Sequence, residues 1–290
     1  MTQPPSRPRR SALYLPASNP RALEKARALP CDVVILDLED AVAPEAKAEA
    51  RAAAAAAVAA GGFGDREVVI RANGLDTPWG ADDLAAAGAA HPHAILVPKI
   101  SAPEDLAAVR TRLPEGAPIW AMIETCAAVF RLEALGAESV NEGVTAWVMG
   151  TNDLAKEMRC RLTVGREPLM AALSLSVMSA RAHGLAILDG VFNEIADAEG
   201  LALQCAQAAD LGFDGKTLIH PSQVEAANAA FTPDPAAVDW ARTVVKAFEN
   251  PEAAGKGVLK VEGRMVERLH FAEAQRLIGV AEAIAARETA

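Results

Sequence analysis

Residues 33–40 read VVILDLED, and this stretch gives the clearest indication of the fold of the chain. The stretch starts with a short apolar run and ends in a cluster of carboxylates. It lacks clean polar alternation, which indicates a parallel strand buried on both faces. The run EAKAEARAAAAAAVAA (45–60) follows after Pro44, is a strong helix former and stops at Gly61-Gly62. A strand followed by a helix is the repeating unit of parallel α/β folds.

The same strand-then-helix unit recurs along most of the chain. The expected strands are 12–16, 33–38, 68–72, 94–99, 118–123, 145–149, 186–189 and 216–219. Eight such units predict an α/β fold, a closed (β/α)₈ barrel of the TIM type. A doubly wound open sheet is the alternative.

The last part of the chain is surplus to an eightfold barrel. Residues 232–250 predict one more helix, the following stretch has glycines and a possible small hairpin, and 271–286 predict a final helix. We therefore expect a barrel domain over residues 1–231. Residues 232–290 would form an extension that acts as a lid or in oligomerisation.

Composition excludes several classes of protein. The chain has 290 residues, of which 51% are hydrophobic and 23% charged, which is typical of a soluble globular protein. A net charge of −10 argues against nucleic acid as a partner. No apolar run approaches the roughly 20 residues that a membrane span needs, and no secretory signal is evident. The four cysteines form no C-x-x-C pair, so we expect a cytoplasmic enzyme with reduced thiols.

Polar residues gather where the chain leaves the expected strands. They include Asp37, Glu39, Asp40, Arg71, Asn73, Lys99, Glu124, Asn152, Asp153, Asp189 and His220. In barrels of this kind, sites form at the C-terminal ends of the strands, so we expect these side chains to share one pocket. Several carboxylates together raise one another's pKa unless a bound cation or basic side chains compensate.

The residue types indicate which cation would bind. Oxygen ligands without a cluster of Cys or His favour Mg²⁺, with Mn²⁺ possible, over zinc. Magnesium typically takes one or two carboxylates and keeps places for water and substrate. Glu124 and Asp153, at the ends of neighbouring strands, fit that role.

Seven motifs in a fixed order carry a family resemblance. They are LYLPASNPRALEKA (13–26), VVILDLEDAVAPEAKAEAR (33–51), VIRANGLDTPW (69–79), MIET (122–125), MGTNDLAKEM (149–158), LDGVFNEIAD (188–197) and LGFDGKTLIHPSQVEAAN (211–228). From about residue 10 to 231 the chain closely resembles the citrate lyase β-subunit-like family. That family includes malyl-CoA and citramalyl-CoA lyases and belongs to the HpcH/HpaI aldolase superfamily. The resemblance implies a (β/α)₈ barrel, Mg²⁺ and CoA-thioester substrates.

The resemblance also implies roles for the residues that bind metal and substrate. Glu124 and Asp153 look like the metal ligands, beside the bound acid. Arg71 looks like the clamp for the carboxylate of a 2-oxo acid, because its planar fork matches a carboxylate. Asn152 lies where the backbone touches the substrate.

Other matching positions imply catalytic and CoA-binding roles. Glu39 and Asp40 resemble catalytic groups that hold metal-bound water and Lys99, which we expect in an internal salt bridge. Tyr14 and Lys25 resemble positions that contact CoA.

The tail departs from the family pattern. Many lyase relatives read K-M-I/V-D, and the Asp comes from the lid of a neighbouring subunit and handles protons at the α-carbon of the thioester. The matching stretch here is 263–267, so Glu267 takes that place. We expect a CoA-ester carbon–carbon lyase that cleaves or forms malyl-CoA or citramalyl-CoA and works as a homotrimer or hexamer. The alternatives are a CoA-thioester hydrolase and a citrate lyase β-type subunit that needs an acyl-carrier partner.

Overall fold

A computed structural model describes residues 7–250, 253 and 255–288. The chain divides into two compact units. The first is Arg9–Phe231, and the second comprises Thr232–Ala290 with the short N-terminal segment Met1–Pro8.

Eight parallel strands of the first unit close into a barrel. They are β1 (Ser11–Pro16), β2 (Val33–Asp37), β3 (Glu67–Arg71), β4 (Ala94–Val97), β5 (Ile119–Ile123), β6 (Val144–Met149), β7 (Ala186–Asp189) and β8 (Gly215–Leu218). Each pairs with the next in sequence, and β1 pairs with β8 to close the sheet. The prediction of a closed (β/α)₈ barrel is confirmed, and the open-sheet alternative is wrong. The strand bounds lie within two residues of those expected.

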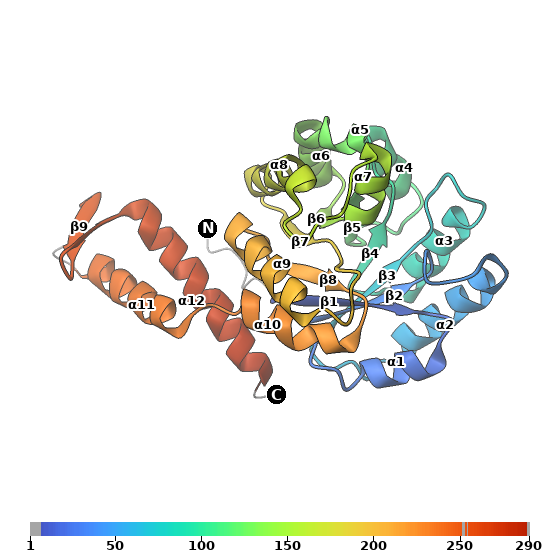
Figure 1. The fold of residues 1–290 in the computed structure, drawn as a ribbon, viewed down its shortest axis with the longest axis horizontal. Coiled ribbons are helices and arrows are strands. Elements are labelled where there is room, and N and C mark those ends of the chain that lie inside the picture. The colour runs from blue at the N-terminus through green and yellow to red at the C-terminus, as the bar shows by residue number, and fades with distance from the viewer. Residues whose placement is uncertain (1–6, 251–252, 254, 289–290) are drawn as a thin grey trace. The chain divides into compact units, whose positions relative to one another are not determined.

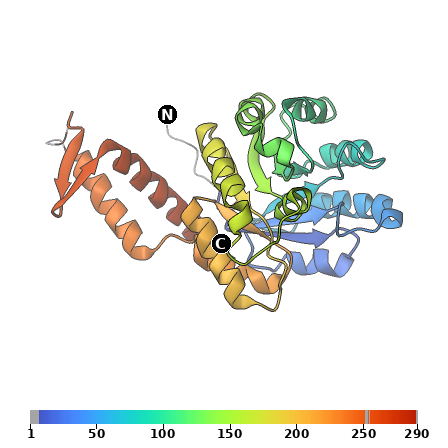
Figure 2. The same ribbon diagram turned by 45° about the horizontal axis from the view of Figure 1, so that its top comes forward.

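Helices surround the barrel (Figures 1 and 2). They are α1 (Pro20–Ala26), α2 (Lys47–Ala60), α3 (Gly80–Ala90), α4 (Pro103–Arg110), α5 (Cys126–Val129), α6 (Leu132–Asn141), α7 (Thr151–Met158), α8 (Met170–Ala182), α9 (Ala198–Leu211) and α10 (Val224–Phe231). Glycines end two of the longer ones, at Gly61 after α2 and Gly212 after α9, both with positive φ.

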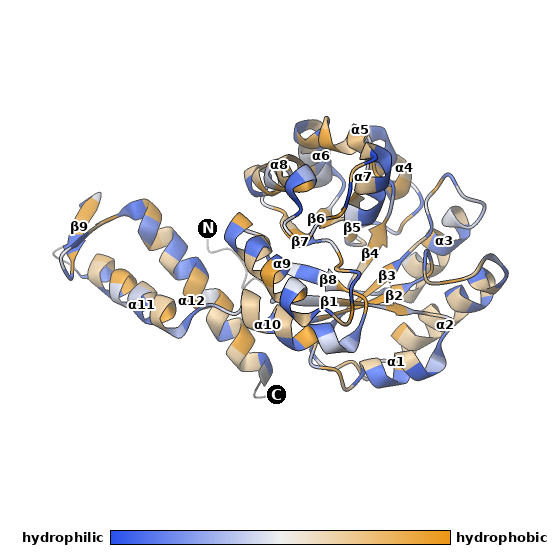
Figure 3. Ribbon diagram, in the orientation of Figure 1, coloured by the Kyte–Doolittle hydropathy of each residue, from blue (hydrophilic) through white to orange (hydrophobic). Residues whose placement is uncertain are grey.

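Two apolar layers hold the barrel together. One lies between the strands and the helices and includes Leu36, Ile70 and Trp147. The other fills the inside of the barrel and includes Ile35 and Trp120. Both faces of the strands are therefore buried, which is why their sequences read as continuous apolar runs (Figure 3).

Alternation along the strands decides which polar side chains face inward. Ile35 and Val69 lie inside the barrel, so Asp37 and Arg71, two residues later on the same strands, point to the same side at the C-terminal end. At the opposite end, Arg9 contacts Glu67 at 2.7 Å. The alternation thus brings Asp37 and Arg71 together at the C-terminal end of the barrel.

The second unit is a helix, a hairpin and a helix. It consists of α11 (Pro235–Glu249), the antiparallel pair β9 (Val258–Val261) and β10 (Arg264–Glu267), and α12 (Arg268–Glu288). A small apolar cluster holds these elements together, in which the rings of Phe248 and Phe271 lie 5.4 Å apart. The hairpin forms as expected, and the final helix starts three residues earlier than expected. Within the described part of the chain, no helix is both long and apolar enough to cross a membrane.

Candidate active site

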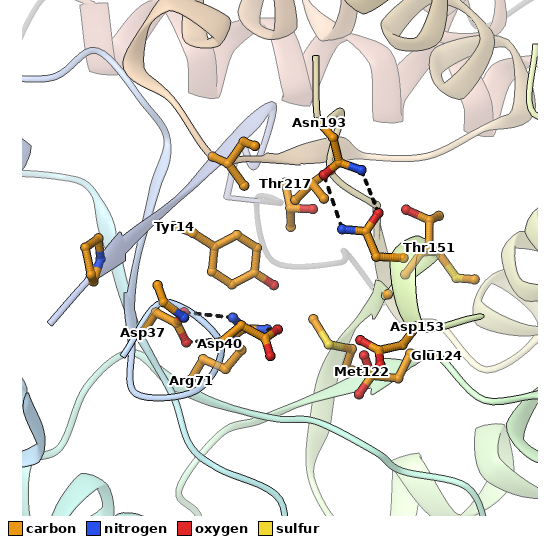
Figure 4. Close-up of a pocket in the computed structure, with 17 residues that line it drawn as sticks. Tyr14, Asp37, Asp40, Arg71, Met122, Glu124, Thr151, Asp153, Asn193 and Thr217 are labelled. Carbon is orange, nitrogen blue, oxygen red and sulfur yellow. Dashed lines mark hydrogen bonds and ion pairs between the residues drawn. The ribbon is translucent and has the colours of Figure 1, made fainter. Parts of the chain in front are cut away.

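A pocket of about 300 Å³ opens at the C-terminal ends of the barrel strands (Figure 4). Its lining includes Tyr14, Asp37, Asp40, Arg71, Met122, Glu124, Asn152, Asp153, Asn193 and Thr217. These residues come from β1, β2, β3, β5 and β8 and from the segments that follow β2, β5, β6 and β7. Side chains that are far apart in the sequence therefore meet in one cavity, as the strand ends predicted.

Glu124 and Asp153 lie side by side on one wall of this pocket (Figure 4). Glu124 is buried, and burial raises the pKa of its carboxyl group. Its neighbour across the strands is Gly150, where an added Cβ would lie 2.4 Å from Glu124 Oε2. Glycine at that position leaves the room that the carboxylate needs.

The ammonium group of Lys99 lies against this carboxylate pair. Lys99 Nζ is 2.7 Å from Asp153 Oδ1 and 3.5 Å from Glu124 Oε1, and the Lys99 backbone N–H donates to Glu124 Oε1. The expected internal salt bridge of Lys99 is present. The residues fit a magnesium ion, because the buried carboxylate of Glu124 and the partly exposed carboxylate of Asp153 meet at a point where both already contact an ammonium group. Among the described residues, no group of three or more His, Cys, Asp or Glu could hold a metal, so the pair would leave the remaining positions to water and substrate.

Arg71 lies on a different wall, in a network of carboxylates. Its Nε and Nη2 donate to the two carboxylate oxygens of Asp37, both at 2.7 Å. Its Nη1 is 2.8 Å from Glu39 Oε2 and 3.2 Å from Asp40 Oδ2. These neighbours hold the pKa of Arg71 above its ordinary value despite burial. One edge of the guanidinium fork is occupied by Asp37, and the other faces Glu39 and Asp40.

This network corrects the partners expected for Glu39 and Asp40. Both were expected to hold Lys99, but both contact Arg71, and Lys99 pairs with Glu124 and Asp153 instead. The reason is strand order. The ends of β2 and β3 are neighbours, with Asp37 in register with Arg71, whereas Lys99 follows β4, next to β5 and close to β6.

Glu39 has an unusual acidity. Burial raises its pKa to about 8, and the nearby carboxylates of Asp40, Glu124 and Asp37 act in the same direction, although Arg71 opposes them. With this pKa, Glu39 carries a proton through most of the neutral range. It can therefore donate a hydrogen bond or a proton inside the pocket, which an ordinary surface glutamate would not do.

The two positions expected to contact CoA lie in different surroundings. Tyr14 lines the pocket, and the guanidinium carbon of Arg71 lies 4.6 Å from the centre of its ring. Lys25 is exposed on α1 and does not line the pocket. Asn152 lines the pocket and exchanges two hydrogen bonds with Asn193, at 3.2 and 2.8 Å. All three roles stay predictions.

Glu267 ends β10 in the second unit. Its residue is exposed, and its backbone N–H donates to His270 Nδ1 at 2.9 Å. The hairpin therefore presents a carboxylate to solvent, and its catalytic role stays a prediction.

The sequence assigned no role to two residues of the site. Asp37 is buried and binds Arg71, and Asn193 pairs with Asn152. Asp37 was one of the polar strand ends, and the inward alternation of β2 could have indicated its place in the pocket, because Ile35 faces the interior. Asn193 belongs to the motif LDGVFNEIAD (188–197), but it follows β7 in an irregular segment, where no strand alternation indicates the direction of its side chain.

The carboxylate pair and the buried arginine lie at the C-terminal ends of the barrel strands, which is where enzymes of the α/β-barrel class have their active sites. The family model described as HpcH/HpaI aldolase/citrate lyase matches residues 10–221. The chain belongs to this family.

Individual relatives extend the match to nearly the whole chain. The chain is 47% identical to a (3S)-malyl-CoA thioesterase of Cereibacter sphaeroides, over 96% of each sequence. It is 33% identical to an L-malyl-CoA/beta-methylmalyl-CoA lyase of the same species, over 98% of each. Among solved structures, CitE of Mycobacterium tuberculosis in complex with magnesium, acetoacetate and coenzyme A is 28% identical, with a TM-score of 0.75 over 94% of this chain and 97% of that one.

Proposed function

We propose that this chain hydrolyses the thioester of a malyl-CoA-like substrate and releases the free acid and CoA. The observation that carries the proposal is the 47% identity, over nearly the full length, to a relative named (3S)-malyl-CoA thioesterase. The pocket supports it, because its two walls offer a carboxylate pair for a metal ion and a fixed arginine for an acid.

Glu124 and Asp153 would hold Mg²⁺ (or Mn²⁺), which when bound polarises substrate oxygens as a Lewis acid. Lys99 would then give up its contact with Asp153 or stay as a neighbour that balances the charge. Arg71, kept in place by Asp37, would hold the carboxylate of the substrate through the edge that Glu39 and Asp40 now share. The acid half of the substrate would thus be oriented between the two walls.

The proton transfers would use carboxylates of this chain. Water attacks the carbonyl carbon of the thioester, and Asp40, which is largely exposed at the pocket, accepts the proton that the water loses. The carbon–sulfur bond breaks, and the leaving thiolate takes a proton, for which protonated Glu39 is a donor. Glu267, on the lid of a neighbouring subunit, would close the site and handle protons near the thioester. CoA would contact Tyr14 and Lys25, and Asn152 would touch the acid.

The second candidate is the carbon–carbon lyase reaction that we expected from the sequence. The 33% identity to an L-malyl-CoA/beta-methylmalyl-CoA lyase favours it. In that reaction a base removes the proton of the hydroxyl group, the bond to the carbon beside the thioester breaks, and the leaving enolate takes up a proton. The same metal and arginine would serve both reactions. The choice therefore rests on whether the site places a water molecule at the thioester carbonyl carbon or a base at the hydroxyl group.

We further propose that the protein is cytoplasmic and that it assembles as a homotrimer or hexamer. In the lyase reaction, its second ligand beside the acyl-CoA would be a small 2-oxo acid. Chromatography with light scattering tests the assembly.

The experiment is product analysis of the purified chain with malyl-CoA and Mg²⁺. Malate with free CoA supports the hydrolase, and glyoxylate with acetyl-CoA supports the lyase. No turnover favours the carrier-dependent subunit. Glu124→Gln is the matched inactive control, and Glu133→Gln, on an exposed face of α6, is the matched active one.

A further inference from the structure

The hydroxyl group of Tyr14 is buried at the pocket. The residue is 9% exposed, and within the described chain its hydroxyl oxygen has no hydrogen-bond partner. Figure 4 shows the ring extending from β1 into the cavity, with the hydroxyl toward the side on which Glu124 and Asp153 lie. Nearly all buried polar groups in proteins are hydrogen-bonded, so a buried hydroxyl that faces a pocket is available to bind what the pocket holds, a ligand or a water molecule.

Packing alone does not account for this side chain. The inside of the barrel is lined by apolar residues such as Val69 and Met122, and Phe would fill the same space without a buried hydroxyl. Tyr14 is the only tyrosine among the 290 residues. Core packing therefore explains the ring but not the oxygen.

The phenol is also held in a fixed place. The guanidinium of Arg71 stacks on its ring at 4.6 Å, and Asp37 fixes that guanidinium through two hydrogen bonds of 2.7 Å. The backbone of β1 is paired on both sides, with β2 and β8. A hydroxyl donor on a rigid strand already has its bound orientation before the ligand arrives, so less conformational entropy is lost on binding.

We infer that the Tyr14 hydroxyl donates a hydrogen bond to an oxygen of the acyl group bound in this pocket. The inference rests on the proposed function for the identity of that group, which is the acid half of a malyl-CoA-like thioester. It assigns the hydroxyl a partner in the acid half, whereas the family resemblance implied only contact with CoA. Burial raises the pKa of Tyr14, and Asp37 and Glu124 act in the same direction, so the group keeps its proton and remains a donor.

Tyr14→Phe tests the inference, because it removes the oxygen and keeps the ring. We expect kcat/KM for malyl-CoA to fall about 10- to 100-fold, the size of a lost hydrogen bond to a charged or partly charged acceptor. The melting temperature of the free enzyme should stay the same or rise, since an unpartnered hydroxyl is removed. Loss of activity without loss of stability is the signature that a packing role would not produce.

Ser176→Ala is the matched control. Ser176 Oγ is likewise buried and without a partner in the described structure, but it lies on α8 and does not line the pocket. It should resemble Tyr14→Phe in melting temperature and wild type in kcat/KM. If Tyr14→Phe keeps kcat/KM within twofold of wild type, or loses activity only in proportion to lost folded protein, the inference is wrong.

A binding measurement separates this inference from the proposed function. With Mg²⁺ present, malate should raise the melting temperature of wild type more than that of Tyr14→Phe. This comparison needs no turnover, so it holds even if the wild-type chain fails to hydrolyse malyl-CoA. Equal stabilisation of both proteins by malate would overturn the inference and leave the hydrolase proposal standing.

Discussion

At the scale of the residue, the site depends on how charges are paired. Asp37 fixes Arg71, and Lys99 contacts both Glu124 and Asp153, so the basic group on each wall of the pocket already has carboxylate partners without a ligand. A substrate carboxylate or a metal ion must then compete with a partner that is already present. This competition makes each wall testable by single substitutions.

The carboxylate pair gives the first prediction. Glu124→Gln and Asp153→Asn should each abolish turnover while the far-ultraviolet circular dichroism stays that of the wild type, because each removes a charged ligand without emptying space. EDTA should stop the wild-type enzyme reversibly, with recovery on adding Mg²⁺. Full activity of the chelated enzyme or of either variant would remove the metal from the mechanism.

Arg71 gives the second prediction. Arg71→Lys should lower kcat/KM by an amount equivalent to about 2–4 kcal/mol, because an ammonium cannot replace a bidentate fork. It should also lower the melting temperature, since buried Asp37 loses one of the two hydrogen bonds that it accepts from the guanidinium. Arg51→Lys is the control, because Arg51 pairs with buried Asp83 away from the pocket and should affect stability alone. A change in kcat/KM of less than about threefold for Arg71→Lys would place the substrate acid elsewhere.

Glu39 gives a prediction about pH. Its pKa is about 8 in the folded state against an ordinary value of 4.5, so the folded chain binds this proton more tightly than the unfolded chain. Its contribution therefore makes the metal-free protein less stable as pH rises from about 4.5 to about 8. Melting curves of Glu39→Gln in EDTA should show a weaker decline over this window than wild type. Parallel curves for the two proteins would show that the pKa of Glu39 is not raised.

At the scale of the element, the strands could be read from sequence and the charge partners could not. Every expected strand formed, because a parallel strand buried on both faces leaves a continuous apolar run. The strand ends identified Arg71, Glu124 and Asp153 as neighbours in one pocket. The pairing of the charges depends on strand order and on the inward alternation. Asp37 was therefore given no role, and Lys99 was given partly wrong partners.

The hairpin of the second unit carries a prediction at this scale. If the carboxylate of Glu267 acts on the thioester, Glu267→Ala should lower kcat about 10²- to 10⁴-fold, the usual contribution of a general acid or base. Binding of malate should be unchanged, because its proposed contacts are on the barrel. Glu267→Asp should be slower than wild type if the lid is adapted to the longer side chain.

Glu262→Ala provides the control for this element. Glu262 is exposed in the turn of the same hairpin, between β9 and β10. Its substitution should leave kcat unchanged. If Glu267→Ala also retains the wild-type rate, Glu267 is a surface residue, and the proton-transfer role of the hairpin must be dropped.

At the scale of the whole molecule, a barrel unit with the pocket is joined to a second unit of two helices and a hairpin. Membership of the family supports CoA-ester chemistry for this chain. The proposed function makes a further claim, which is that water attacks the thioester carbon and the carbon–carbon bond stays intact. Hydrolysis and cleavage leave different atoms in the products, so isotopes distinguish them directly.

The measurement is turnover of malyl-CoA by the purified chain with Mg²⁺ in water enriched in ¹⁸O, followed by mass spectrometry of the products. The account predicts free CoA and malate carrying one ¹⁸O atom in the carboxylate released from the thioester. Both products should be absent with Glu124→Gln. Glyoxylate and acetyl-CoA in place of labelled malate would contradict the account and assign the chain to the lyases of its family.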